Sequence, residues 1–319
     1  MALQNITDKQ LFPVLTGWRL PLALWVLFYH LNAILYDLFQ PPLIVMDILQ
    51  RGYFAVDVFF TISGLVIAHH YGAILGKFQK RDYLHFLWLR LARVYPLHLT
   101  ILLALAMMVI LAPVLDYRIN QPQDYSLPLF IANLALVQAW SIPDDLDWNH
   151  PAWAISAEWF AYLASPFLFR ILNRNWSRSF YLLLGLAALA LPVIIRYATQ
   201  QEHGTFALYR VIGDFTAGIC LYHILPVSWR LLQKPGFLLN RAWLYGGQIS
   251  YALYMVQYPV LLVMRKVWPH QHIMHDTLLI RLLYMVILIT LVVSTAILCY
   301  HLIEEPARRY LRQRNPFKR

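Results

Sequence analysis

Long apolar stretches recur along this sequence, and they limit its possible folds more than any other feature. A helix needs about 20 mostly apolar residues to cross the hydrocarbon core of a bilayer. Eight stretches qualify, at residues 14–38, 53–76, 94–115, 151–172, 179–199, 205–225, 243–264 and 277–303. Strands are not expected, because these stretches are too long for strands and lack an alternation of period two. We therefore expect an all-α, polytopic transmembrane helix bundle.

The composition agrees with a membrane solvent. Hydrophobic residues make up 60% of the 319 residues and charged residues only 13%, against about 45–50% and about 25% in globular proteins. A soluble protein of this size could not bury so much apolar surface in one core. No sizeable segment is left between the apolar stretches. We expect residues 1–319 to form one integral-membrane domain without an appended soluble domain.

The basic residues predict how the bundle is oriented. The 26 Lys and Arg outnumber the 16 Asp and Glu, which in a soluble protein would suggest a nucleic-acid partner. Here they lie in short clusters between apolar stretches, as the positive-inside rule predicts, so no nucleic-acid partner is expected. The clusters are Lys77–Arg93, Arg170–Arg178, Arg230–Arg241 and Arg308–Arg319.

Placing all four clusters in the cytoplasm puts both termini there and requires an even number of crossings. Eight crossings satisfy this rule, and ten remain open because short spans are easily missed. The acidic loop Asp144–Asp147 then lies outside. Residues 125–141 must in that case enter and return on the outer side, or lie at the interface.

The sequence predicts neither a disulfide framework nor a metal centre. Cys220 and Cys299 both lie within apolar stretches, so no secreted, disulfide-linked domain is implied. His270, His272 and His275 lie close together and admit a metal site as one interpretation. No carboxylate pattern or fourth ligand accompanies them. We favour a solvated loop and expect no metal.

Arg19 and His30 both lie within the first apolar stretch, where ionisable side chains are costly. They are eleven residues apart, about three turns, and therefore share one face with a separation of about 16 Å. One interpretation is that Arg19 extends to the headgroups while His30 bonds to a neighbouring helix. The other is that both face a functional interior.

Two carboxylates also lie at membrane depth. Asp57 occurs in GYFAVDVFFTISG and Glu158 in WAISAEWFAYLASP. A buried aspartate needs a partner, and a histidine is a sensible one, because a carboxylate fixes the tautomer of an imidazole. Together with Arg19 and His30, these residues predict an internal polar cavity.

Arg90 and Arg93 are three residues apart in LWLRLARVYPLH and share a helix face just before the third predicted span. Two guanidiniums at the cytoplasmic mouth would form a clamp for phosphate groups. Positive-inside anchoring would also place arginines here. Spacing alone leaves both interpretations open.

Six segments in a fixed order resemble the motifs of the acyltransferase 3 family of integral-membrane acyltransferases. They are TGWRLPLALWVLFYH, RGYFAVDVFFTISG, RLARVYP, WAISAEWFAYLASP, ISYALYMVQYP and IEEPARRY, and they span nearly the whole chain. Three positions depart from the family pattern. Thr16, Ala154 and Gln257 stand where an acidic residue, a serine and a histidine are common. The last departure suggests a changed acceptor or simple drift.

The resemblance implies a membrane-embedded O-acyltransferase. Members of the family usually transfer an acetyl group from acetyl-CoA to a hydroxyl. Their acceptors are commonly sugars of surface polysaccharides, lipopolysaccharide or lipid-linked glycan precursors. The expected location is the cell membrane, in particular a bacterial inner membrane.

On this resemblance we expect the donor to enter from the cytoplasmic side. Arg90 and Arg93 would bind the phosphates of the CoA nucleotide, with Arg19 assisting. The pantetheine arm would then follow the first helix toward His30.

His30 is the expected catalytic residue. Its neutral imidazole would take the proton of the acceptor hydroxyl, or would itself carry the acyl group. Asp57 or Glu158 would orient the ring and stabilise its cationic form, as a carboxylate does in a catalytic triad.

A second class of function remains open from the residues alone. A polytopic transporter or flippase also uses intramembrane His, Asp and Glu to relay protons or bind substrate. No inverted repeat is visible in the sequence. A purely structural bundle would leave so many buried charges unexplained.

Overall fold

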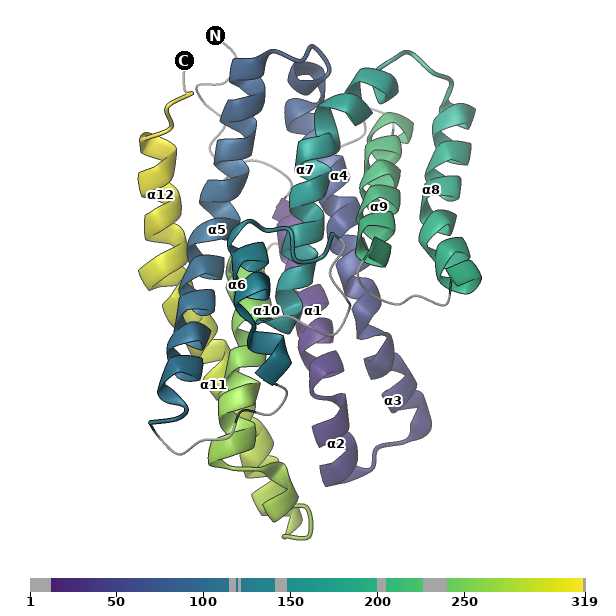
Figure 1. Ribbon diagram of the computed structural model, residues 1–319. Coiled ribbons are helices and arrows are strands. Elements are labelled where there is room, and N and C mark those ends of the chain that lie inside the picture. The colour runs from purple at the N-terminus through teal and green to yellow at the C-terminus, as the bar shows by residue number, and fades with distance from the viewer. Residues whose placement is uncertain are drawn as a thin grey trace.

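The computed structural model describes residues 13–114, 119, 122–140, 148–199, 205–225 and 240–317. Every regular element in these ranges is helical, as the sequence predicts, and they contain no strand. The long helices run side by side in one bundle (Figure 1).

Within the described ranges, eight long helices correspond to the eight apolar stretches. They are α1 (Pro13–His30), α4 (Phe54–Leu75), α5 (Lys80–Leu111), α7 (Trp153–Leu172), α8 (Arg178–Thr199), α9 (Thr205–Ile224), α10 (Arg241–Val267) and α11 (Leu278–Cys299). Four shorter helices are α2 (Asn32–Phe39), α3 (Leu43–Gln50), α6 (Leu127–Leu134) and α12 (Glu305–Gln313). A π-helical turn at Tyr300–Glu304 joins α11 to α12.

The helices identify a multi-pass membrane protein. Within the described residues, four helical stretches are long and apolar enough to cross a membrane: Leu43–Leu75, Lys80–Leu111, Arg178–Ala198 and Leu278–Gln313. The bent pair of α1 and α2 makes a fifth if it is one span. Helices α7, α9 and α10 belong to the same bundle but carry more polar residues. Eight to ten crossings therefore stay a prediction.

Three boundaries refine the sequence analysis. The predicted stretch 14–38 is not one straight helix, because the chain breaks at Leu31 and α2 is inclined by 61° to α1. Helix α5 begins at Lys80, well before the predicted residue 94. Helix α6 has only eight residues, about 12 Å, so this helix is too short to cross the membrane.

Small residues set the closest helix contacts. Helices α4 and α9 run parallel, and a Cβ on Gly64 would collide with the carbonyl of Phe215. Gly218 likewise lies against the carbonyl of Thr61. Gly247 of α10 has the same relation to α1. Such glycines let membrane helices approach backbone to backbone, which fixes their relative positions.

Basic segments that are distant in sequence meet at one end of the bundle. The amide of Asn173, which follows α7, donates to the carbonyl of Gly72 near the end of α4 (2.6 Å). At the same end, Trp88 of α5 donates to the carbonyl of Leu311 in α12 (2.8 Å). Basic residues 77–81, 170–178 and 308–314 therefore lie at a common end, as the charge pattern requires. That this end faces the cytoplasm stays a prediction.

Two of the charge predictions lie outside the described residues. These are the acidic loop 144–147 and most of the basic cluster 230–241.

Candidate functional site: an arginine-lined cavity inside the bundle

A cavity of about 120 Å³ lies between α1, α4, α5, α7 and α10. Its apolar wall includes Val56, Phe59, Phe60 and Val94. Its polar lining is formed by Arg19, Ser63, Arg90, Arg93, Glu158, Tyr162, Ser250, Tyr251 and Tyr254. The internal polar cavity predicted from the buried charges is therefore present, with four of the six predicted site residues around it.

Three arginines give the cavity its charge. Arg19 comes from α1, and Arg90 and Arg93 come from one face of α5. Because α5 begins at Lys80, these two lie about 15 and 20 Å along the helix, inside the bundle and not at its mouth. Among the described residues of the lining, Glu158 is the one carboxylate, and buried Glu304 outside the lining also interacts with Arg93 and Arg19.

The three guanidiniums differ in how the protein holds them. Arg90 donates to the hydroxyl of Tyr71 (3.4 Å). It also lies over the rings of Tyr71 and Phe86, at 5.3 and 5.7 Å from their centroids, where cation–π attraction steadies it. Arg19 and Arg93 make no hydrogen bond to any other described residue. Their N–H groups can therefore pair with an anion.

A hydrogen-bonded network joins α4 to α7 on the opposite wall. The hydroxyl of Ser63 donates to Oε1 of Glu158 (2.6 Å) and lies 3.4 Å from the hydroxyl of Tyr162. Glu158 also interacts electrostatically with Arg19. The carboxylate is therefore fixed by Ser63 as a counter-charge within the cavity.

His30 lies at the last residue of α1, next to the break at Leu31, and does not line the cavity. Its Nδ1 is 3.0 Å from the carbonyl oxygen of Val26. Because a carbonyl only accepts, Nδ1 carries a proton, and Nε2 of the neutral ring holds the lone pair. The ring of His150 meets His30 edge-on with a centroid distance of 6.2 Å.

The prediction that Asp57 pairs with a histidine is wrong. Its Oδ1 accepts from Nε and Nη2 of Arg210 on α9, at 2.8 and 2.7 Å. Arg210 also donates to the carbonyl of Tyr53 (3.3 Å) and lies 5.0 Å from the ring centroid of Trp153. The parallel packing of α4 and α9 brings the permanent cation of Arg210 to the level of Asp57. A buried carboxylate is stabilised better by a cation than by a neutral imidazole.

The expectation that a carboxylate orients His30 is corrected as well. Asp57 bonds to Arg210 and Glu158 to Ser63. The carbonyl of Val26, one turn earlier in α1, fixes the ring instead.

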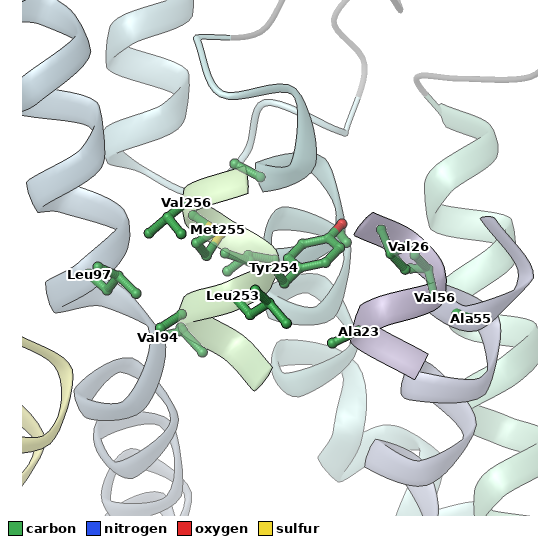
Figure 2. Close-up of a cluster of buried hydrophobic side chains, with 14 of the residues drawn as sticks. Ala23, Val26, Ala55, Val56, Val94, Leu97, Leu253, Tyr254, Met255 and Val256 are labelled. Atoms are coloured by element: carbon green, nitrogen blue, oxygen red, sulfur yellow. The ribbon is translucent and has the colours of Figure 1, made fainter. Parts of the chain in front are cut away.

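An apolar layer separates the cavity from His30. Figure 2 shows this cluster, in which side chains from α1, α4, α5 and α10 meet, including Ala23, Val26, Val56, Val94 and Tyr254. Ala23 and Val26 lie between Arg19 and His30 along α1, whereas Val56, Val94 and Tyr254 also line the cavity. The hydroxyl of Tyr254 donates to the carbonyl of Pro151 (2.9 Å). The structure thus brings Arg19, Arg90, Arg93 and Glu158 together, but not His30 or Asp57.

Sequence reasoning missed Arg210 and assigned no role to His150, Tyr254 or Ser250. Arg210 carried a usable signal, because it is an arginine within an apolar stretch, as Arg19 is. His150 had none, since it lies just before the stretch at 151–172.

Comparison with known families decides what kind of bundle this is. The model of the acyltransferase 3 family, described as an acyltransferase domain, matches residues 13–225. The chain belongs to this family. The match extends from α1 to the end of α9 and includes all six predicted site residues. Membership favours a membrane acyltransferase over a transporter.

A curated relative bears the same kind of name. Acyltransferase MdmB from Streptomyces mycarofaciens is 31% identical over 201 residues, which is 59% of this chain and 47% of the relative. The chain therefore spans about half the length of the curated relative that it matches. No solved structure matches the chain.

Proposed function

We propose that the protein is an O-acyltransferase of the cell membrane, in particular of a bacterial inner membrane. It would transfer an acetyl group from acetyl-CoA to a hydroxyl of a sugar in a surface polysaccharide, lipopolysaccharide or lipid-linked glycan precursor. One observation carries the proposal. A chain of an acyltransferase family encloses a cavity with three arginines and one carboxylate.

The charge of the cavity suits the donor. CoA carries its phosphate groups on a nucleotide, from which a long, thin pantetheine arm extends to the thioester. Guanidiniums bind phosphate oxygens in paired hydrogen bonds, and such bonds are strong where water is excluded. Arg19 and Arg93 make no hydrogen bond to the described part of the chain, and Arg90 donates to the hydroxyl of Tyr71. We assign these three arginines to the phosphates of the donor.

Transfer requires the thioester to pass the apolar layer toward His30. Tyr254 lies where α10 faces α1, and its hydroxyl donates to the backbone carbonyl of Pro151. A single neutral hydrogen bond contributes only about 0.5–1.5 kcal/mol. Breaking this bond is therefore a small cost against the binding energy that three arginines supply.

His30 then performs the chemistry from its free ring nitrogen. Nε2 takes the proton of the acceptor hydroxyl while the oxygen attacks the thioester carbonyl. A C–O bond forms, the C–S bond breaks, and the proton passes on to the departing thiolate. In a two-step route the same Nε2 would carry the acyl group. We assign Asp57 to the packing of α4 on α9, and Glu158 to the charge balance of the cavity.

The end of the bundle at which the acceptor arrives follows from the same geometry. His30 lies at the end of α1 that is remote from the clustered basic residues. With those residues in the cytoplasm, as the charge rule predicts, the acceptor reaches His30 from the outer side.

Calorimetry with CoA in detergent tests the donor site. The double variant Arg90→Ala/Arg93→Ala should bind CoA at least about tenfold more weakly, because two charge-assisted contacts are lost. The matched control is Arg174→Ala, which removes an exposed arginine at the basic end of the bundle. Unchanged affinity in the double variant, or equal loss in the control, would contradict the proposal.

A further inference from the structure

Gln257 is a completely buried amide on α10, with no exposed surface. Its side-chain nitrogen donates to the carbonyl of Tyr254 (3.0 Å), which fixes the orientation of the amide. Its Oε1 has no hydrogen-bond partner among the described residues. Buried polar atoms in native proteins are nearly always paired, so an unpaired one calls for an explanation.

The surrounding backbone is arranged to hold this part of α10 in place. Pro259 lacks an N–H and leaves the carbonyl of Met255 without its usual helical donor. The side-chain amide of Asn149 donates a hydrogen bond to that carbonyl instead (3.3 Å). This contact fastens the short helical turn His150–Ala152 to α10 beside the His30 ring. The Gln257 amide itself is held by its bond to the carbonyl of Tyr254.

The side chain of Gln257 interacts with the His30 ring. In the neutral ring, the proton on Nδ1 is bound by the carbonyl of Val26. Nε2 then offers only a lone pair, and a lone pair cannot bond to the carbonyl oxygen of an amide. Once Nε2 is protonated, it becomes a donor. Oε1 of Gln257 can then accept from it.

Among the described residues, no acidic group is found to act on the His30 ring. The described groups from other elements that act on the ring are His150, Gln257 and Arg265, and Tyr29 contacts it from its own helix. None of these residues is acidic. Asp57, one of the carboxylates expected to balance the ring, is bound by Arg210 instead. The amide oxygen of Gln257 is therefore the neighbouring group suited to accept from the cationic ring.

We propose that Gln257 is a positioning residue, whose Oε1 accepts a hydrogen bond from Nε2–H of His30 after the ring has taken the proton of the acceptor hydroxyl. The inference rests on the proposed acyl transfer. The hydroxyl oxygen forms the C–O bond, the C–S bond breaks, and the proton on Nε2 later goes to the thiolate. The bond exists only in the charged form of the ring, so it lowers the barrier without tightening substrate binding.

Two substitutions separate this role from simple packing. Gln257→Met and Gln257→Glu both lose the donor to Tyr254 and keep a similar length, but only Glu keeps an acceptor. We expect Gln257→Met to lower kcat about 10–100-fold with unchanged KM for acetyl-CoA, as loss of a hydrogen bond to a charged group predicts. Gln257→Glu should keep kcat within a few-fold. The acidic limb of its kcat profile should move to higher pH, because a carboxylate favours the protonated ring. Equal losses in the two variants, or wild-type kcat in Gln257→Met, would overturn the proposal.

A direct titration keeps this test independent of acyl transfer. The ¹³C signal of His30 in labelled protein, assigned by its loss in His30→Ala, reports ring protonation in detergent. Its midpoint should lie at lower pH in Gln257→Met and at higher pH in Gln257→Glu than in the unaltered protein. Identical midpoints in the three proteins would refute the contact even if acyl transfer were established. Shifted midpoints without any acyl transfer would instead contradict the proposed function.

Discussion

The ion pair between Asp57 and Arg210 makes a quantitative prediction, because its loss would leave a charge inside the bundle. The side chains of Arg210 and Asp57 are only 11% and 24% exposed, and the atoms approach to 2.7 Å. Removing one partner of a fully buried pair costs about 3–5 kcal/mol. Since a quarter of Asp57 is exposed, we expect Arg210→Met to reduce the free energy of unfolding by about 2–4 kcal/mol.

Thermal unfolding in detergent, followed by tryptophan fluorescence, would measure this loss. The double variant Asp57→Asn/Arg210→Met removes both charges and should recover more than half of the lost stability. The difference between single and double variants then isolates the pair. Full stability in Arg210→Met would refute the reasoning. So would an additive double variant, because Asp57 would then be free of Arg210 and open again to a role in catalysis.

Two further substitutions probe the cavity and the layer beneath it. Tyr254→Trp should lower kcat while leaving CoA affinity unchanged, because the larger ring obstructs the path of the thioester and not the site of the phosphates. Stopped-flow measurement of acyl transfer gives kcat, and calorimetry gives CoA affinity. A loss of CoA affinity would contradict this prediction. Glu158→Gln removes the one carboxylate in the lining and should tighten CoA binding up to about tenfold at low salt, with weaker or equal binding as the contrary result.

The helices were predictable because lipid imposes a strict length and composition on them. Each apolar stretch became a helix at nearly the expected place. The start of α5 was not predictable in this way. Residues 80–93 carry Lys, Arg and Asp, so hydropathy places the start of the span too late, whereas the helix already includes these good helix formers. The break at Leu31 has neither proline nor glycine next to it, and only tertiary contacts place it.

The candidate site divides along similar lines. Arg19, Arg90, Arg93 and Glu158 could be predicted to share a cavity, because each is too costly to face lipid. The partner of Asp57 could not be predicted, because it depends on which helix lies beside α4, and side-chain periodicity does not encode lateral neighbours. The same holds for Val26, since a backbone carbonyl leaves no mark in a sequence. Gln257 stood out as a departure from the family pattern, but its position beside His30 came only from the structure.

The central claim is that Nε2 of His30 receives the hydroxyl proton in acyl transfer from a donor bound by the cavity arginines. The most direct test is single-turnover transfer from radiolabelled acetyl-CoA. It is measured with the purified His30→Gln variant added to membranes that supply the native acceptor. The account predicts that transfer is abolished while CoA affinity and thermal stability are retained. Transfer near the rate of the unaltered protein would contradict it.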